Sequence, residues 1–507
     1  MLWHRRILFA LTLLLVIGSL SVTSGYALYI HSDAYRAEVA RSVGEFLTLP
    51  TRIDDVEPRT RTSRGFFGVR LYLPGGKTQI FAAEHAVWQE AAGEAARVNE
   101  LDVYDGWLQL GSKTLGEGDY RDVLRGGLAH DFTELNLANV RFHDIDLRWR
   151  QPELHLEAQD ADGLVTFEPD GSGQAQLETY TLNGTTVDEP ITIRAAFRSG
   201  NELEFRNILL NVPRMPLGSL ALEEMTGAPV NSGWYEGTVS FRPTSARQVY
   251  TLRGAVEDAR LEDFTRTLPT GVVHGRLDVE LTEARVAPGQ ILALAFGGRL
   301  QDIQVADLAH ILGITDLRGQ ADVSVARCVY ADRSLQLLSA KADVAHVPAE
   351  AVTRLIGRGR ITGVVHVKVN ALLIEDDDLR HADVEIDVVP PKDAPGIIER
   401  AVVLALAKEA LGVDLGRIGD YLPESVEYTR MGCRLVADGD ELRVKGTHGD
   451  KGETVLTLKL FGREIGVLDA PDRVFPIGGL VDEVRNRLAD YDSRHLLERF
   501  KRAEDEN

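Results

Sequence analysis

Strands that restart at a glycine dominate the middle of this chain. Alternating apolar and polar residues follow the glycine in Gly237–Phe241, Gly275–Leu281, Gly319–Val325 and Gly363–Val369, and weaker restarts lie at Gly254 and Gly298. Such alternation is typical of a strand with one buried and one wet face. Restarts about every 20 residues match one up-and-down strand pair, which predicts an antiparallel meander. Because sheets twist, a long meander is expected to curl into a trough with an apolar inside.

The apolar residues after each glycine are expected to share one face of this sheet, and their polar neighbours are expected to face water. The predicted lining is Val239, Phe241, Leu277, Val279, Leu281, Val323, Val325, Val365, Val367 and Val369. The predicted wet face carries Asp278, Glu280, Ser324, His366 and Lys368. Alternation does not decide between the lining of a trough and an ordinary packed core.

The net charge of the chain limits the kinds of partner that it is expected to bind. The net charge of −21 and the isoelectric point near 5.1 leave no basic stripe to neutralise phosphates, which argues against nucleic acid. They also argue against electrostatic docking on an anionic membrane. Any membrane contact is therefore expected to rely on apolar insertion.

The N-terminus offers such an insertion. Ile7–Ile30 contains 24 residues without a charge and follows Arg5 and Arg6, so residues 1–31 predict a cytoplasmic stub and one transmembrane helix. The alternative is a signal peptide cleaved near Ser24 or Ala27. Either interpretation exports the rest of the chain.

Three further regions follow the anchor. Residues 32–232 begin with a predicted helix, Ser32–Leu47, and continue as a strand-rich region. Residues 233–392 hold the glycine-initiated strands, with helical inserts at Val305–Leu312 and Ala349–Ile356. Residues 393–507 open with Gly396–Leu411, which is apolar nearly all round and predicts a buried helix. They close with Ile477–Phe500, which predicts an amphipathic helix.

No pattern in the sequence predicts catalysis, a cofactor or a metal site. The histidines are scattered singly, and His143, His155 and His366 are interpreted as surface side chains within strands. Glu375–Asp378 is interpreted as a wet loop between strands, because four consecutive carboxylates cannot all face one ion. Cys328 and Cys433 are interpreted as small buried hydrophobes, with one disulfide as the alternative.

Three segments follow the anchor and its helix: Leu49–Pro58, Ser63–Val69 and Ala83–Trp88. This order of segments resembles the AsmA-like family of bacterial bridge-like lipid-transfer proteins. Leu49-Pro50-Thr51 stands where the family usually has Thr-Gly. Further along, Ile303–Leu308 leads through a short helix to Leu317–Val323, which is similar to the family's C-terminal region.

The resemblance implies a single-pass inner-membrane protein whose periplasmic body is a mainly β, taco-shaped antiparallel groove. It also implies binding or conduction of phospholipid, or another lipid, toward the outer membrane. Two rivals remain at this stage. One is a scaffold for outer-membrane or periplasmic proteins without lipid conduction. The other is an enzyme with a dispersed active site, which would need titratable groups converging in a cleft.

Overall fold

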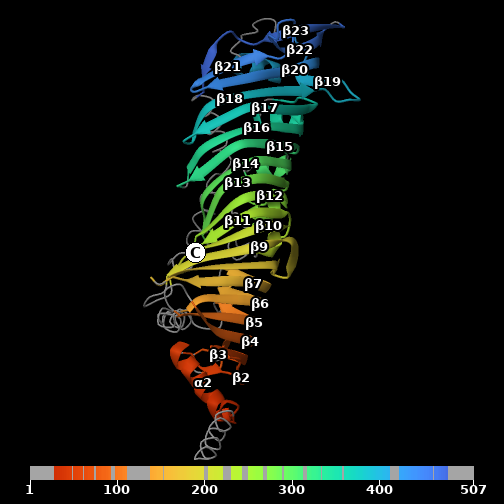
Figure 1. Cartoon of the computed structure of the whole chain (residues 1–507). Coiled ribbons are helices and arrows are strands. Elements are labelled where there is room, and N and C mark those ends of the chain that lie inside the picture. The colour runs from red at the N-terminus through yellow and green to blue at the C-terminus, as the bar shows by residue number, and fades with distance from the viewer. Residues whose placement is uncertain are drawn as a thin grey trace, which may run out of the picture. The chain divides into compact units, whose positions relative to one another are not determined.

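A computed structural model describes residues 28–477 except 48, 61, 74–75, 93–96, 111–136, 152–153, 169, 199–203, 221–229, 242–248, 267–270, 288–289, 312–316, 333, 357–358, 411–421 and 461 (Figure 1). As predicted, the chain is mainly β, and its antiparallel sheet is open and curled. Two compact units divide it: Met1–Met225 with Gly237–Tyr250 form unit 1, and Thr226–Glu236 with Thr251–Asn507 form unit 2.

Unit 1 begins with the predicted helix, which is confirmed as α2 (Asp33–Leu47), and Ser32 Oγ accepts a hydrogen bond from Tyr35 N at 3.2 Å as its cap. Its strands are β1 (Thr51–Arg52), β2 (Asp55–Pro58), β3 (Ser63–Tyr72), β4 (Gln79–Ala92), β5 (Arg97–Leu110), β6 (Leu137–Gln151), β7 (Leu154–Phe167), β8 (Ser172–Leu182), β9 (Thr185–Arg198) and β10 (Glu204–Pro216), followed by the 3-10 turn η1 (Leu217–Leu220). β11 (Trp234–Phe241) is divided between the units.

The pairing in unit 1 departs from a simple meander at one point. β3 to β10 pair in sequence order, and all of these pairs are antiparallel except β5–β6, which is parallel. A parallel pair needs a crossover connection, and residues 111–136, which make this connection, lie outside the described residues.

Unit 2 contains β12 (Tyr250–Arg260), α5 (Leu261–Thr265), β13 (Arg276–Ala287), β14 (Gln290–Gln304), α6 (Val305–Ile311), β15 (Gln320–Ala331), β16 (Ser334–Pro348), α7 (Ala349–Ile356), β17 (Val364–Glu375), β18 (Asp378–Val389), β19 (Gly396–Glu399), α8 (Arg400–Ala405), the π-helix η2 (Leu406–Ala410), β20 (Ser425–Asp438), β21 (Glu441–Gly446), β22 (Thr454–Leu460), β23 (Arg463–Asp469) and β24 (Val474–Pro476). β13 to β18 pair antiparallel in sequence order, and β18 then pairs with β20.

Two sequence predictions for helices in unit 2 meet different outcomes. The inserts at 305 and 349 are confirmed as α6 and α7. The helix predicted over Gly396–Leu411 is wrong in its first turn, because Gly396–Glu399 pair as β19 with β20, and the helix begins only at Arg400. The backbone groups of Gly396–Glu399 find partners in the sheet, which a helix could not offer them there.

The two chain ends contain predictions that stay open. Residues 7–27 of the predicted span and residues 478–500 of the predicted terminal helix lie outside the described residues. Among the helices that the structure does describe, none is both long and apolar enough to cross a bilayer. The two cysteines are free thiols, as favoured from the sequence.

The repeat in unit 2 is a strand pair plus a helix, not a strand pair alone. Gly275, Gly319 and Gly363 are 44 residues apart and each directly precedes a strand, whereas Gly254 and Gly298 lie inside β12 and β14. The carbonyls of the first three accept hydrogen bonds at 3.0–3.1 Å from the first residue of α5, α6 and α7 respectively. The helix inserts thus belong to the repeat, which doubles the period predicted from the strands.

A left-handed residue three positions before the first residue of each helix marks the same repeat. Asp258 and Asp302 have φ of 49° and 56°, and their N–H groups donate to the carboxylates of Asp278 and Asp322 at 2.7 and 2.9 Å. In the third repeat the equivalent pair is His346, with φ of 61°, and His366. The two imidazole rings meet edge to face, with their centroids 5.8 Å apart.

Replacing His366 with asparagine is expected to stabilise unit 2 by about 1 kcal/mol, because it supplies a side-chain acceptor for His346 N–H. Thermal denaturation followed by circular dichroism measures this effect. Lys368→Asn is the matched control, since Lys368 is exposed on the same strand. Equal melting temperatures for the two variants would contradict this interpretation of the repeat.

A ladder of stacked rings crosses unit 1 on the face opposite its apolar core. Phe67, His85, Tyr104 and His143 are cross-strand neighbours on β3 to β6, with ring centroids 4.7–5.4 Å apart. His143, predicted as a surface side chain, is therefore part of a stack. Burial lowers the pKa of His85, and so does Arg59, whose Nη2 lies 2.7 Å from His85 Nε2.

This pKa shift predicts acid sensitivity. As the pH falls, the unfolded chain takes up a proton at the ordinary histidine pKa, while folded His85 takes it up only at lower pH. The contribution of His85 to stability is therefore fully present when the pH is above the ordinary histidine pKa. It is lost as the pH falls from that value through the lowered pKa of folded His85. The melting temperature of wild type should fall more than that of His85→Phe between neutral pH and about pH 5. Tyr104→Phe, which keeps the ladder and both of its histidines, is the control and should keep the wild-type dependence.

Candidate functional site

Four rows of apolar side chains cross the strands of unit 2 on one face of its sheet. Directly opposed residues on neighbouring strands share a face, so the register defines each row. The first row, nearest the helices, is Ile303, Ala321, Val344, Val367, Ile386 and Cys433. The second row is Leu277, Leu300, Val323, Ala342, Val369, Val384, Leu435 and Val444.

Two more rows lie toward the hairpin turns. The third row is Val279, Gly298, Val325, Ala340, Leu372, Ala382, Ala437 and Leu442. The fourth row is Leu281, Phe296, Cys328, Leu338, Ile374 and Leu379. None of the four rows contains a charged side chain, so together they form a continuous apolar face.

The structure brings together most of the lining predicted in the repeats. Leu277, Val323 and Val369 stand in the second row, Val279 and Val325 in the third, Leu281 in the fourth and Val367 in the first. Val365 lies beyond the first row, in a packed core with Val388 and Ile398. Val239 and Phe241 are buried residues of unit 1, where the Phe241 ring contacts Tyr250.

Most of the lining was missed from the sequence. β14, β16 and β18 supply residues such as Leu300, Phe296 and Leu338, and none of the glycines that anchored the prediction precedes these strands. Their own alternation of apolar and polar residues was the available signal. A search anchored on glycine found only every second strand.

The apolar face is only partly covered by the described residues. Leu300, Val323, Phe296 and Leu338 are half-buried, whereas Val403 in the nearby packed core is fully buried. Cover is present in three places. The core that contains Val403 packs against four residues of the first row and one of the second, namely Val344, Val367, Ile386, Cys433 and Val444. On the helix side, Leu261 and Val305 pack with residues of the first two rows. At the C-terminal end, Phe475 and Ile477 pack over the third row at Ala382, Ala437 and Leu442.

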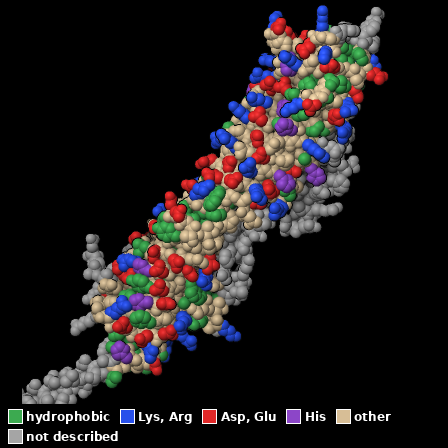
Figure 2. Space-filling model, turned by 90° about the vertical axis from the view of Figure 1, so that its right-hand side faces the viewer, with side chains coloured by type: hydrophobic (Ala, Val, Ile, Leu, Met, Phe, Trp, Pro, Cys, Tyr) green, Lys and Arg blue, Asp and Glu red, His purple; other side chains and the backbone are tan. Residues whose placement is uncertain are grey.

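The opposite face of the sheet is charged. Asp343, Lys368, Glu385, Arg434 and Lys445 are successive cross-strand neighbours on β16 to β21. Arg434 Nε also donates to Asp383 at 2.7 Å, and the hydrogen bonds from Arg434 hold the pKa of Asp383 below its usual range. Figure 2 shows one side of the molecule, on which acidic and basic side chains gather.

The predicted wet residues lie with these charges. Glu280, Ser324 and Lys368 are exposed, while Asp278 and His366 are half-buried because of their contacts within the repeat.

Both thiols sit on the apolar face, and neither is activated. Burial raises the pKa of Cys328, and burial with the nearby charge of Asp387 raises that of Cys433 to about 11. A thiol with a raised pKa is a poor nucleophile at neutral pH. Within the described part of the chain, no group of three or more His, Cys, Asp or Glu side chains is placed to hold a metal ion. The chemistry that this face offers is apolar contact.

Comparison with known proteins adds no identification. No protein-family model, curated protein or solved structure matches the chain.

Proposed function

We propose that the apolar face of unit 2 binds the acyl chains of a phospholipid or a similar lipid, in a protein that carries lipid between the inner and outer membranes. One observation carries the proposal. Four uncharged apolar rows run side by side across the strands, and many of their side chains stay half-buried. A packed core would bury them, and a polar ligand would need polar partners on this face.

The free energy of burying an acyl chain and the length of the rows both favour this ligand. An acyl chain gains about 0.8 kcal/mol for each CH₂ that it buries. With strands about 4.8 Å apart, the second row extends over roughly 34 Å. A single leaflet's acyl chain spans about 15 Å, half of the hydrocarbon core. The row therefore exceeds the length of one tail, and its uniform lining would let a tail move along it.

Photo-crosslinking tests the proposal. A photoreactive residue at Val369, in the second row, should form lipid adducts in cell envelopes, detected by mass spectrometry. The same residue at Lys368, the neighbour on the charged face, should form none. Crosslinks within the protein at both positions would indicate a closed core and would favour the scaffold alternative.

The proposed location is the inner membrane, with the span at residues 7–30 and the body in the periplasm. The support is the uncharged run after Arg5 and Arg6. A reporter that works only in the periplasm should be active when fused after Asn507. A soluble mature chain beginning near Tyr26 would support the cleaved signal peptide instead.

A further inference from the structure

The three helices of the repeat carry an apolar side chain at the same place. The fourth residues of α5, α6 and α7 are Phe264, Leu308 and Val352, each 44 residues from the next. Leu308 is 40% exposed, and the other two are half-buried. An exposed leucine alone needs no explanation. An apolar side chain that recurs at the same place in three repeats, beside an apolar face, does call for an explanation.

Each of these side chains lies next to a buried residue on the surface of its own helix. The first residues of the helices, Leu261, Val305 and Ala349, are buried, and the first two pack with Leu300 and Val323 of the rows. Residues three apart on a helix lie on neighbouring positions of its surface. Val352 accordingly packs against the core that contains Val347 and Val365. By the repeat, Leu308 holds the equivalent place on α6.

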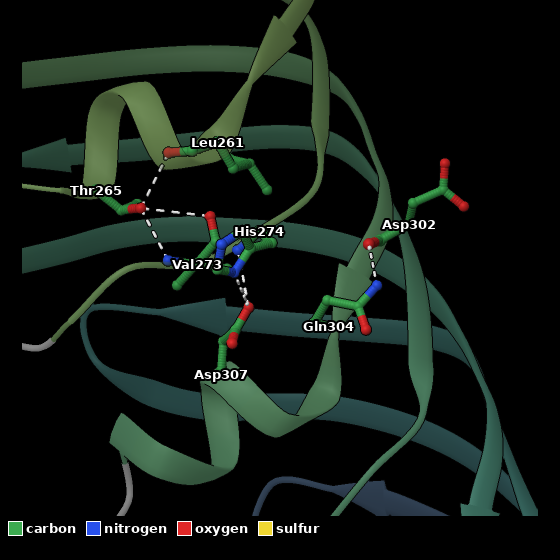
Figure 3. A network of polar contacts seen from close by, with 7 residues as sticks. All are labelled: Leu261, Thr265, Val273, His274, Asp302, Gln304 and Asp307. Atoms are coloured by element: carbon green, nitrogen blue, oxygen red, sulfur yellow. Dashed lines mark hydrogen bonds and ion pairs between the residues drawn. The ribbon is translucent and has the colours of Figure 1, made fainter. Parts of the chain in front are cut away.

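α5 and α6 are tied in position by their third residues. Asp307 accepts a hydrogen bond from His274 N at 2.9 Å, and its carboxylate lies 2.9 Å from His274 Nδ1 (Figure 3). Asp263 is 6% exposed and accepts from Asn231 N, Ser232 N and Ser232 Oγ at 2.6–3.1 Å. Thr265 Oγ1 further joins α5 to Val273 N at 2.9 Å. These bonds fix the apolar side chains before any ligand arrives.

We propose that Phe264 and Leu308 form a second apolar wall, which holds an acyl chain against the first and second rows. At α7 the protein's own core fills the equivalent space beside Val352. This proposal rests on the proposed function and names a part of its site that lies outside the sheet. The occupant is an acyl chain because the wall lies beside uncharged rows and adds no charged side chain to them. A wall of helices would keep a tail on the apolar face while leaving its headgroup in water.

The test uses the full-length protein and vesicles of phosphatidylethanolamine and phosphatidylglycerol. A photoreactive residue at Leu308 should give lipid adducts, and the same residue at exposed Ala306 should give at least about fivefold fewer. Val369 serves as the reference on the sheet. Adducts at Val369 but not at Leu308 would overturn the second wall and leave the proposed function standing. Adducts at neither position would overturn both, and crosslinks from Leu308 to another protein would overturn the assignment of the occupant.

A substitution supplies an independent readout. Leu308→Asp should lower lipid uptake from these vesicles about fivefold to tenfold, because a charge faces the tail. Ala306→Asp should leave uptake unchanged. Leu308 is exposed, so the melting temperature should stay at the wild-type value in both variants. Unchanged uptake in Leu308→Asp would contradict the proposal. If Leu308→Asp fails to fold, Leu308→Ser provides the same comparison.

Discussion

Replacing Val403 with aspartate is expected to destabilise unit 2 by roughly 3–5 kcal/mol, because it buries a carboxylate without a partner. Val403 is 0% exposed in α8 and belongs to a core with Ile398, Tyr428 and Leu456. Urea denaturation followed by circular dichroism measures the loss as a lower midpoint. The loss is a large fraction of the stability of a typical domain.

The neighbouring residue provides the control. Leu404 is 37% exposed on the same helix, so Leu404→Asp can keep its charge in water and should cost about 1 kcal/mol or less. Equal midpoints for the two variants would mean that α8 does not bury the face containing Val403. A wild-type midpoint for Val403→Asp would lead to the same conclusion.

The sequence around α8 illustrates what composition can predict. Near all-round apolarity indicated a buried helix, and Val402, Val403 and Ala407 are buried. It did not indicate that Gly396–Glu399 would form a strand. That choice depends on β20, where the ring of Tyr428 lies so close to Gly396 that a Cβ there would be 2.6 Å from Cε1. Partners distant in sequence decide such segments, and a local pattern does not contain them.

The rows illustrate a second limit. Counting by twos from each glycine placed Val365 in the lining with Val367 and Val369. Val365 does keep their side of β17, because the register shift between β16 and β17 lies on β16, between Val344 and Val347. It stands opposite Val347, one pair beyond the first row, where a core that contains Ile398 covers it. Alternation predicts which side of a strand a residue lies on, and it does not predict what covers that side.

The parallel pair of unit 1 was also beyond the sequence pattern. β5 and β6 show the same alternation as their antiparallel neighbours, for example in Ile145–Trp149. Alternation reports which side chains share a face, and it carries no information about strand direction. The mainly β class, the helix α2 and the lining residues that follow the repeat glycines on β13, β15 and β17 were predictable because each depends on local periodicity.

Gly298 is the position in the apolar face where the smallest substitution should have the largest effect. It lies in the third row between Val279 and Val325, with φ of 150°. A Cβ there would lie 2.2 Å from the carbonyl oxygen of Asp278 and 2.6 Å from Val279 Cα. These are backbone atoms of the paired strand, so they cannot rotate away as a side chain would. The clash can be relieved only by moving β13 away from β14.

Gly298→Ala is therefore expected to cost roughly 3–5 kcal/mol, from steric overlap and backbone strain together. Gly439→Ala separates the two causes, because Gly439 also has positive φ, 56°, but nothing lies within 4 Å of a Cβ there. Strain alone should cost about 1 kcal/mol in that variant. Urea midpoints of the two variants measure the difference. Similar midpoints would mean that β13 and β14 can move apart at little cost in free energy. The close contact of Gly298 with Val279 would then be unimportant for the stability of the third row.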